Sequence, residues 1–310
     1  MNYANLKELT IATRKSPLAL WQANFVAAKL KELLPNAEIR LLPMLTKGDK
    51  TSSQNWLQQN GKDMFVKELE EALLTKKADL AVHSMKDLGV TLKNGLTLAA
   101  ILSRANPFDA LVSNKYPALL SLPKGAKIGT ASLRRKAQLL QFRSDFNVQT
   151  LRGNLQTRLK KMADEDFDGI ILAVAGLERL NLSALIREKI NPNIMLPACG
   201  QGALGIECRA DNSHLLTLLA KLNSANSSLC VLTERRINAK LGGNCHTPIG
   251  IYCAIANDTL HINTKVLSQD GKHCIAVNLS GLPKDAFKLA DKCALELFNK
   301  GASDLLTTDN

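Results

Sequence analysis

The chain has 310 residues, which is long enough for two or three domains, each with its own core. Hydrophobic residues make up 45% and charged residues 22%, as in ordinary globular proteins, and no apolar run approaches the roughly 20 residues that span a bilayer. The formal net charge is +12, which attracts nucleic acid, membrane surfaces and small carboxylates or phosphates alike. Aromatic residues are only 4%, which weakens the case for single-stranded nucleic acid stacked on aromatic side chains.

The seven cysteines are odd in number, scattered, and without a C-x-x-C pair. This pattern argues against a disulfide framework and against a zinc site, and we expect no bound metal. It favours a reducing compartment. The first ten residues show no basic region followed by an apolar run, as a secretory signal would. We therefore expect a cytoplasmic protein whose cysteines are mostly small core residues.

The first hundred residues alternate strand and helix patterns. Residues 9–13 predict a strand, and Ser16 and Pro17 suit the N-cap and first position of a helix that ends near Leu34. The other elements expected here are strands at residues 38–43, 80–82 and 96–102 and a helix at residues 64–74. The long polar segment at residues 47–63 is typical of a functional or mobile loop.

Residues 80–87 read Leu-Ala-Val-His-Ser-Met-Lys-Asp, so a buried strand pattern ends abruptly in polar and sulfur-containing side chains. Ligands of open α/β sheets bind beyond the carboxyl ends of the strands, which makes this strand end a candidate catalytic edge. The alternative is a loop whose polar side chains cap the following turn. Position alone does not separate the two interpretations.

At residues 103–109 the sequence becomes polar and includes a proline, which indicates a hinge between domains. The alternation then restarts, with strands expected at residues 110–112, 127–129, 148–151 and 169–173 and helices after the last three of them. Residues 196–207 are glycine-rich and then apolar, as in a strand that returns the chain to the first domain. They lack a G-x-G-x-x-G motif after a strand, so no dinucleotide site is expected.

The remainder of the chain has a different character. The elements expected here are helices at residues 215–222 and 228–241, strands at 249–256, 260–267 and 273–280, and a closing amphipathic helix at 286–298. The turn residues between the strands predict an antiparallel meander, so this part is interpreted as a small α+β domain. Before it, Cys245 lies in a glycine-rich loop bounded by Pro248. Loop positions favour function, but the spacing does not choose among a nucleophile, an attachment point and an exposed thiol.

An arrangement of strand, short turn and helix with an arginine recurs four times. A single arginine at a helix start is unusual, because the dipole there repels cations. Several of them at strand ends predict a bound anion, since guanidinium groups hold carboxylate and phosphate in a bidentate way. The alternative is that all are solvated surface residues. The arginines in question are Arg14, Arg134, Arg135, Arg152, Arg158 and Arg179.

Taken together, the motifs resemble the porphobilinogen deaminase (hydroxymethylbilane synthase) family over nearly the whole chain. The matching motifs are residues 12–23, 65–70, 81–87, 129–135, 151–154, 172–177, 200–203, 205–208 and the Cys245 loop. The resemblance implies an α/β fold with two doubly wound periplasmic-binding-protein-like domains plus a small C-terminal α+β domain with a three-stranded antiparallel sheet. The implied boundaries are residues 1–102 with 203–222, residues 108–197, and residues 225–310.

The resemblance also implies an activity. Members of the family are transferases that join four porphobilinogen molecules head to tail onto an enzyme-bound dipyrromethane, release ammonia each time, and free hydroxymethylbilane by hydrolysis for porphyrin and haem biosynthesis. The dipyrromethane cofactor would be held by a thioether at Cys245. A monomer is expected, with the small molecule porphobilinogen as substrate and with neither nucleic acid nor a membrane as partner.

By the same resemblance, Asp87 is the catalytic carboxylate, which bonds pyrrole N–H groups, stabilises developing positive charge and shuttles protons. The residues expected to contact the cofactor or substrate are Arg14, Ser16, Lys86, Ser132, Arg134, Arg135, Arg152, Arg158 and Arg179. Lys62 and Phe65 match the family's mobile loop, although Asn60 and Asp63 depart from its glycine-rich pattern. His83 and Ser84 are ambiguous, and structural roles are favoured for both.

Two rival classes remain open at this point. A two-lobed protein with a basic cleft could simply trap a small dianion, as solute sensors do, although Asp87 would repel such a ligand. A nucleic-acid-binding protein would use the positive charge and would bind duplexes with a steep salt dependence. Pyrrole chemistry separates the deaminase interpretation from both.

Overall fold

The computed structural model describes residues 7–46, 66–243 and 247–306. The chain divides into two compact units: unit 1 comprises Met1–Arg104 and Ala203–Ser228, and unit 2 comprises Ala105–Gly202 and Leu229–Asn310. Among the described residues, no single helix has the length and apolar character needed to cross a membrane. Two consecutive helical segments, Ser213–Leu222 and Ala225–Lys240, have that length and apolar character only when they are taken together, and the chain bends by 105° between them.

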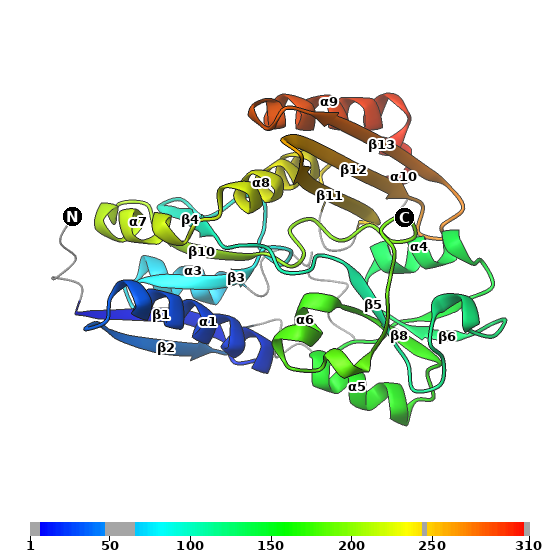
Figure 1. Cartoon of the computed structure of the whole chain (residues 1–310), viewed down its shortest axis with the longest axis horizontal. Helices are drawn as coiled ribbons and strands as arrows, with labels where there is room; N and C mark the ends of the chain where they lie inside the picture. Colours follow the sequence, from blue (N-terminus) through cyan, green and yellow to red (C-terminus); the bar gives the residue numbers. More distant parts are fainter. Residues whose placement is uncertain (1–6, 47–65, 244–246, 307–310) are drawn as a thin grey trace. The chain divides into compact units, whose positions relative to one another are not determined.

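Unit 1 is built on a five-stranded sheet (Figure 1). Its strands are β1 (Glu8–Arg14), β2 (Glu38–Met44), β3 (Leu80–Ser84), β4 (Leu96–Ile101) and β10 (Leu204–Arg209), in the order β2-β1-β3-β10-β4. β1 pairs in parallel with both β2 and β3, whereas β10 runs antiparallel to β3 and β4. The returning strand expected from residues 196–207 is therefore present. It inserts between two strands that are far earlier in the sequence.

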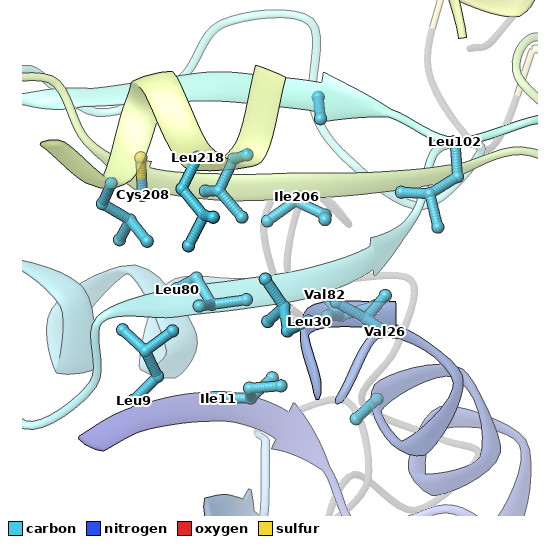
Figure 2. Close-up of a cluster of buried hydrophobic side chains, with 14 of the residues drawn as sticks. Leu9, Ile11, Val26, Leu30, Leu80, Val82, Leu102, Ile206, Cys208 and Leu218 are labelled. Carbon is cyan, nitrogen blue, oxygen red and sulfur yellow. The ribbon is translucent and has the colours of Figure 1, made fainter. Parts of the chain in front are cut away.

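Helices cover both faces of this sheet. α1 (Pro17–Leu33) begins at the N-cap Ser16, whose hydroxyl accepts a 3.3 Å hydrogen bond from the Ala19 amide. α1 and α7 (Ser213–Leu219) pack on one face, where side chains from β1, β3, β4 and β10 meet those of both helices. Figure 2 shows part of this cluster. α3 (Lys67–Leu74) packs on the other face, against Ala81. The carboxyl ends of β1 and β3 thus lie between the start of α1 and α3.

Unit 2 contains a second five-stranded sheet with the same plan. Its strands are β5 (Asp109–Val112), β6 (Lys127–Gly129), β7 (Asn147–Gln149), β8 (Gly169–Ala173) and β9 (Ile186–Lys189), in the order β7-β6-β8-β5-β9. β6 is parallel to β7 and β8, and β5 is antiparallel to β8 and β9. The fourth strand in each order, β10 in unit 1 and β5 in unit 2, is antiparallel to both of its neighbours. Each of these strands is the first that the chain forms after it leaves the other unit.

The helices of this sheet start where the sequence predicted. They are α4 (Leu133–Phe142), α5 (Leu155–Asp164) and α6 (Val174–Arg179). Ser132 and Asn154 are the N-caps of α4 and α5, and each accepts a hydrogen bond from a backbone amide in the first turn. Strand β9 was not predicted from the sequence; it is short, with one apolar residue followed by three charged ones.

The C-terminal part of unit 2 is an antiparallel meander, as expected. Its elements are α8 (Ala225–Lys240, which begins in unit 1), β11 (Ile249–Ala256), β12 (Thr259–Leu267), β13 (Cys274–Gly281), α9 (Ala286–Asn299) and α10 (Ala302–Leu306). Short 3₁₀ turns occur at Leu119–Ser121, Ser183–Leu185, Ala220–Leu222 and Pro283–Asp285. Asn257 and Asp258 both have positive φ, at 48° and 56°, which is the backbone of a tight hairpin turn. The α/β class, with a separate three-stranded antiparallel sheet, is confirmed.

Candidate active site

A pocket in unit 1 lies at the carboxyl ends of β1 and β3. It is lined by Arg14, Ser16, Leu18, Ala19, Gln22, Val66, Leu69, Val82, His83, Ser84 and Asp87. Three residues that the sequence analysis singled out, Arg14, Ser16 and Asp87, thus share one pocket. They come from segments about 70 residues apart in the chain.

The sheet explains why they meet. Arg14 is the last residue of β1, Ser16 caps α1, and Asp87 follows β3, which is the parallel neighbour of β1. The Asp87 amide donates a 2.9 Å hydrogen bond to the Ser84 carbonyl, so a tight turn sets the position of the carboxylate. Asp87 is exposed and Arg14 is half-buried. The pocket therefore offers both a cation and an accessible carboxylate. Lys86 is half-buried in the same turn but does not line the pocket.

Two further polar pairs complete the pocket wall. The Gln22 amide Nε2 donates to the Ser84 hydroxyl at 2.9 Å. His83 Nε2 lies 2.8 Å from Glu207 Oε2 on β10. Gln22 and Glu207 were not predicted from the sequence, because their apolar helix and strand surroundings give only a weak signal. A charged residue inside an apolar strand, as Glu207 is, nonetheless requires a partner.

In unit 2 the expected arginines Arg134 and Arg135 converge on Asp109. Arg134 Nη1 donates to one carboxylate oxygen at 2.7 Å, and Arg135 donates to the other through Nε at 3.1 Å and Nη2 at 2.7 Å. Gln201 Nε2 adds a 2.9 Å bond to Asp109. Asp109 is the first residue of β5 and pairs with Ala173 at the end of β8. This carboxylate therefore lies at the edge of the sheet where α4 begins.

This cluster is buried and carries one anion for two cations. Burial alone would raise the pKa of Asp109, but the two guanidinium groups outweigh it and hold that pKa well below its usual range. Arg134 also donates to the Leu196 carbonyl at 2.6 Å, yet its Nε finds no hydrogen-bond partner among the described residues. The cluster therefore keeps an excess of positive charge inside unit 2.

The other expected contact residues in unit 2 occupy varied positions. Ser132 caps α4, and Arg152 is half-buried in the turn before α5. Arg158 lies within α5 and donates to the Gly153 carbonyl at 2.8 Å. Arg179 is the last residue of α6, so the argument from a helix start does not hold for it. It donates to the Gly202 carbonyl at 2.7 Å, and burial lowers its pKa to about 10, which leaves it protonated at neutral pH.

Three expected site residues lie outside the described residues: Lys62 and Phe65 of the expected loop, and the expected attachment residue Cys245. Of the described cysteines, Cys208, Cys230, Cys253 and Cys293 are buried. Across residues 7–46, 66–243 and 247–306, no group of three or more His, Cys, Asp or Glu side chains is arranged to hold a metal ion.

Comparison with known proteins identifies the family. The description "Porphobilinogen deaminase, dipyromethane cofactor binding domain" matches residues 9–217, and "Porphobilinogen deaminase, C-terminal domain" matches residues 228–299. The chain belongs to the porphobilinogen deaminase family. A porphobilinogen deaminase of Legionella pneumophila (strain Lens) is 52% identical over 97% of this chain and 98% of its own length. That of Dichelobacter nodosus is 47% identical over the same shares.

Solved structures with a similar arrangement are more distant. A putative methionine-binding lipoprotein of Bacillus subtilis has a TM-score of 0.44 and 14% identity, covering 71% of this chain and 92% of its own. A nutrient-binding protein of Burkholderia cenocepacia bound to methionine has a TM-score of 0.43 and 15% identity, covering 75% and 95%. Membership of the porphobilinogen deaminase family rests on the sequence matches alone.

Proposed function

We propose that this protein is a porphobilinogen deaminase that builds hydroxymethylbilane from four porphobilinogen molecules on an enzyme-bound dipyrromethane. The observation that carries the proposal is the pocket in unit 1. It places a carboxylate, Asp87, beside a cation, Arg14, in a chain whose family model is a dipyrromethane-binding domain. The proposal includes action as a cytoplasmic monomer without nucleic-acid or membrane partners.

The charge of the substrate supports the assignment of the arginines. Porphobilinogen and dipyrromethane rings carry acetate and propionate groups, so the growing chain accumulates carboxylates. The Asp109 cluster has two guanidinium groups for one carboxylate, and this excess positive charge attracts such groups. We assign the binding of carboxylate side groups and ring substituents to Arg14, Ser16, Lys86, Ser132, Arg134, Arg135, Arg152, Arg158 and Arg179.

Asp87 is the catalytic carboxylate in this proposal. When bound, dipyrromethane supplies the free ring carbon on which the product chain is extended. Asp87 accepts hydrogen bonds from pyrrole N–H groups and stabilises the positive charge that develops on the ring as ammonia leaves. Its exposed position in a tight turn also lets it take up the proton that the ring loses.

Cys245 is the proposed thioether attachment site, and Lys62 and Phe65 are proposed as the counterparts of the family's mobile-loop residues. The proposal keeps three domains: residues 1–102 with 203–222, residues 108–197, and residues 225–310. Each of the three sheets has its own buried cluster, which supports this division.

Mass spectrometry tests the proposal directly. The purified chain is expected to exceed its sequence mass by two linked pyrrole rings, to colour with a pyrrole reagent, and to release ammonia from porphobilinogen. Cys245→Ser is expected to fold and to carry no adduct. Unmodified wild-type protein that releases no ammonia from porphobilinogen would refute the function, and an intact adduct on Cys245→Ser would refute the attachment site.

A further inference from the structure

His83 and Glu207 form a buried pair inside the sheet of unit 1. Their side chains are 5% and 0% exposed, and His83 Nε2 lies 2.8 Å from Glu207 Oε2. In the β3–β10 ladder, His83 is opposite Gly205 and Glu207 is opposite Ala81, so both side chains project from the face that carries Ala81. The pair joins residues 124 positions apart in the sequence.

Glu207 relies on His83 as its hydrogen-bond partner. A fully buried carboxylate needs a partner, and Glu207 Oε1 has no hydrogen-bond partner among the described residues. Two charged groups on neighbouring elements have partners of their own. Glu70 on α3 pairs with Lys93 at 3.4 Å, and Arg209 on β10 donates to the carbonyls of Leu73 and Ala78. The Glu207 carboxylate is therefore available to stabilise a proton on the His83 ring.

The pair also fixes the orientation of the ring. When Glu207 is ionised, Nε2 carries the proton that it shares with the carboxylate, and Nδ1 is left as the second, exchangeable nitrogen. No described residue makes a hydrogen bond to Nδ1. Two charged residues, Arg14 from β1 and Asp87, line the same pocket as His83. A carboxylate-oriented imidazole at a pocket wall is an arrangement that moves protons in enzymes.

We propose that His83, held by Glu207, is a proton-relay residue that takes from Asp87 the proton released at each ring addition and passes it to the departing ammonia. This inference rests on the proposed function, because it needs Asp87 as the first proton acceptor. It gives His83 a role in turnover, where the sequence favoured a structural one.

The relay balances for each porphobilinogen added. The aminomethyl group enters as ammonium, its carbon–nitrogen bond breaks, and the electron pair leaves with ammonia. A carbon–carbon bond forms at the electron-poor methylene carbon, and the attacking ring carbon loses its proton to Asp87. His83 Nδ1 takes this proton, which restores the Asp87 carboxylate, and the imidazolium is neutralised by Glu207. The proton then passes to ammonia, which departs as ammonium, so no other co-reactant is needed.

The decisive variant is His83→Gln, whose amide N–H can still donate to Glu207 but cannot carry a proton. We expect kcat for ammonia release to fall by about 10²-fold, with KM and the unfolding midpoint close to wild type. In His83→Ala, free imidazole is expected to restore part of the lost rate in a saturable manner. The matched control is His261→Gln at an exposed position on β12, where neither the variant nor imidazole should change kcat.

The outcomes separate this inference from the proposed function. Wild-type protein that fails to release ammonia from porphobilinogen refutes the function itself. Active wild type with His83→Gln within about twofold of its kcat overturns only the relay. A folded His83→Ala that stays impaired at every imidazole concentration overturns it too, because a purely structural histidine would behave in that way.

Discussion

Arg135 donates two hydrogen bonds to the same carboxylate oxygen of Asp109, from Nε at 3.1 Å and from Nη2 at 2.7 Å. The other oxygen accepts from Arg134, so a single buried carboxylate orders two guanidinium groups. Asp109 is therefore central both to the stability of unit 2 and to the direction of its arginines. The first two predictions follow from this relationship.

Asp109→Asn should destabilise the protein strongly. The substitution leaves two buried guanidinium groups without an anion, and breaking a buried ion pair costs roughly 3–5 kcal/mol in the free energy of unfolding. Urea unfolding at pH 7 measures this loss. The matched control is Asp145→Asn, which breaks the more exposed ion pair with Arg143, and its loss should be clearly smaller. Equal losses for the two variants would contradict the buried role of Asp109.

The stabilisation by Asp109 should depend on pH with a defined sign. Its folded-state pKa is held below the ordinary value of about 3.9, so the ionised form stabilises the fold fully above that value. The advantage of wild type over Asp109→Asn should therefore be constant near neutrality and shrink as the pH falls below about 4. Unfolding free energies of both proteins across this range test the sign, and a difference that grows on acidification would refute it.

Asp87→Asn should retain the fold and lose most turnover. Asp87 is exposed and its backbone amide, not its carboxylate, closes the turn to Ser84, so stability should hardly change. Loss of a positioned acid or base commonly costs about 10²–10⁴-fold in rate. Ammonia release from porphobilinogen measures kcat, and thermal unfolding monitors the fold. Turnover near wild type in this variant would remove Asp87 from the mechanism.

The rate of thiol labelling should be lower for the buried cysteines than for the partly exposed ones. Burial raises the pKa of Cys208 to about 11 and also raises the pKa of Cys293. At pH 8 about one part in a thousand of Cys208 is then thiolate, so it should react far more slowly than the partly exposed Cys199 and Cys274. Timed labelling of the folded protein followed by peptide mass mapping measures this order. Rapid labelling of Cys208 would contradict its placement in the sheet core.

The number of thiols in the denatured protein is an independent test of the thioether attachment. If Cys245 holds a thioether, unfolded wild type should titrate one thiol fewer than its seven cysteines. Cys245→Ser should give the same count without the added pyrrole mass. A full count of seven in wild type would exclude a thioether at any cysteine.

Local sequence signals were sufficient for the elements and for the pocket in unit 1. Ser16 and Pro17 marked the start of α1, and Arg14 and Asp87 could be assigned to strand ends because apolar strand patterns precede them. Parallel pairing of β1 and β3 then brings the two strand ends together. This part of the site was predictable because it depends on periodicity, capping and the general geometry of parallel sheets.

The polar partners were not predictable in this way. Asp109 accepts hydrogen bonds from Arg134, which is 25 positions away in the sequence, and from Gln201, which is 92 positions away. No local sequence pattern encodes such distant pairings. Arg134 and Arg135 were expected to contact ligand, whereas their principal partner here is a carboxylate at the start of an apolar strand. Strand β9 was not predicted because its four residues, one apolar and three charged, carry no period-2 hydrophobic signal.

The insertion of β10 between β3 and β4 has a consequence for biogenesis. During synthesis the ribosome delivers the other four strands of that sheet first, and then all five strands of the second sheet. Until residues 204–209 emerge, β3 and β4 lack the neighbour that joins them, and the backbone groups they present to it remain unpaired. Glu207 arrives with the same strand, so the nascent chain cannot assemble its histidine pair before the sheet is closed. A chain that ends before residue 204 should therefore aggregate or recruit a chaperone, however intact its first hundred residues are.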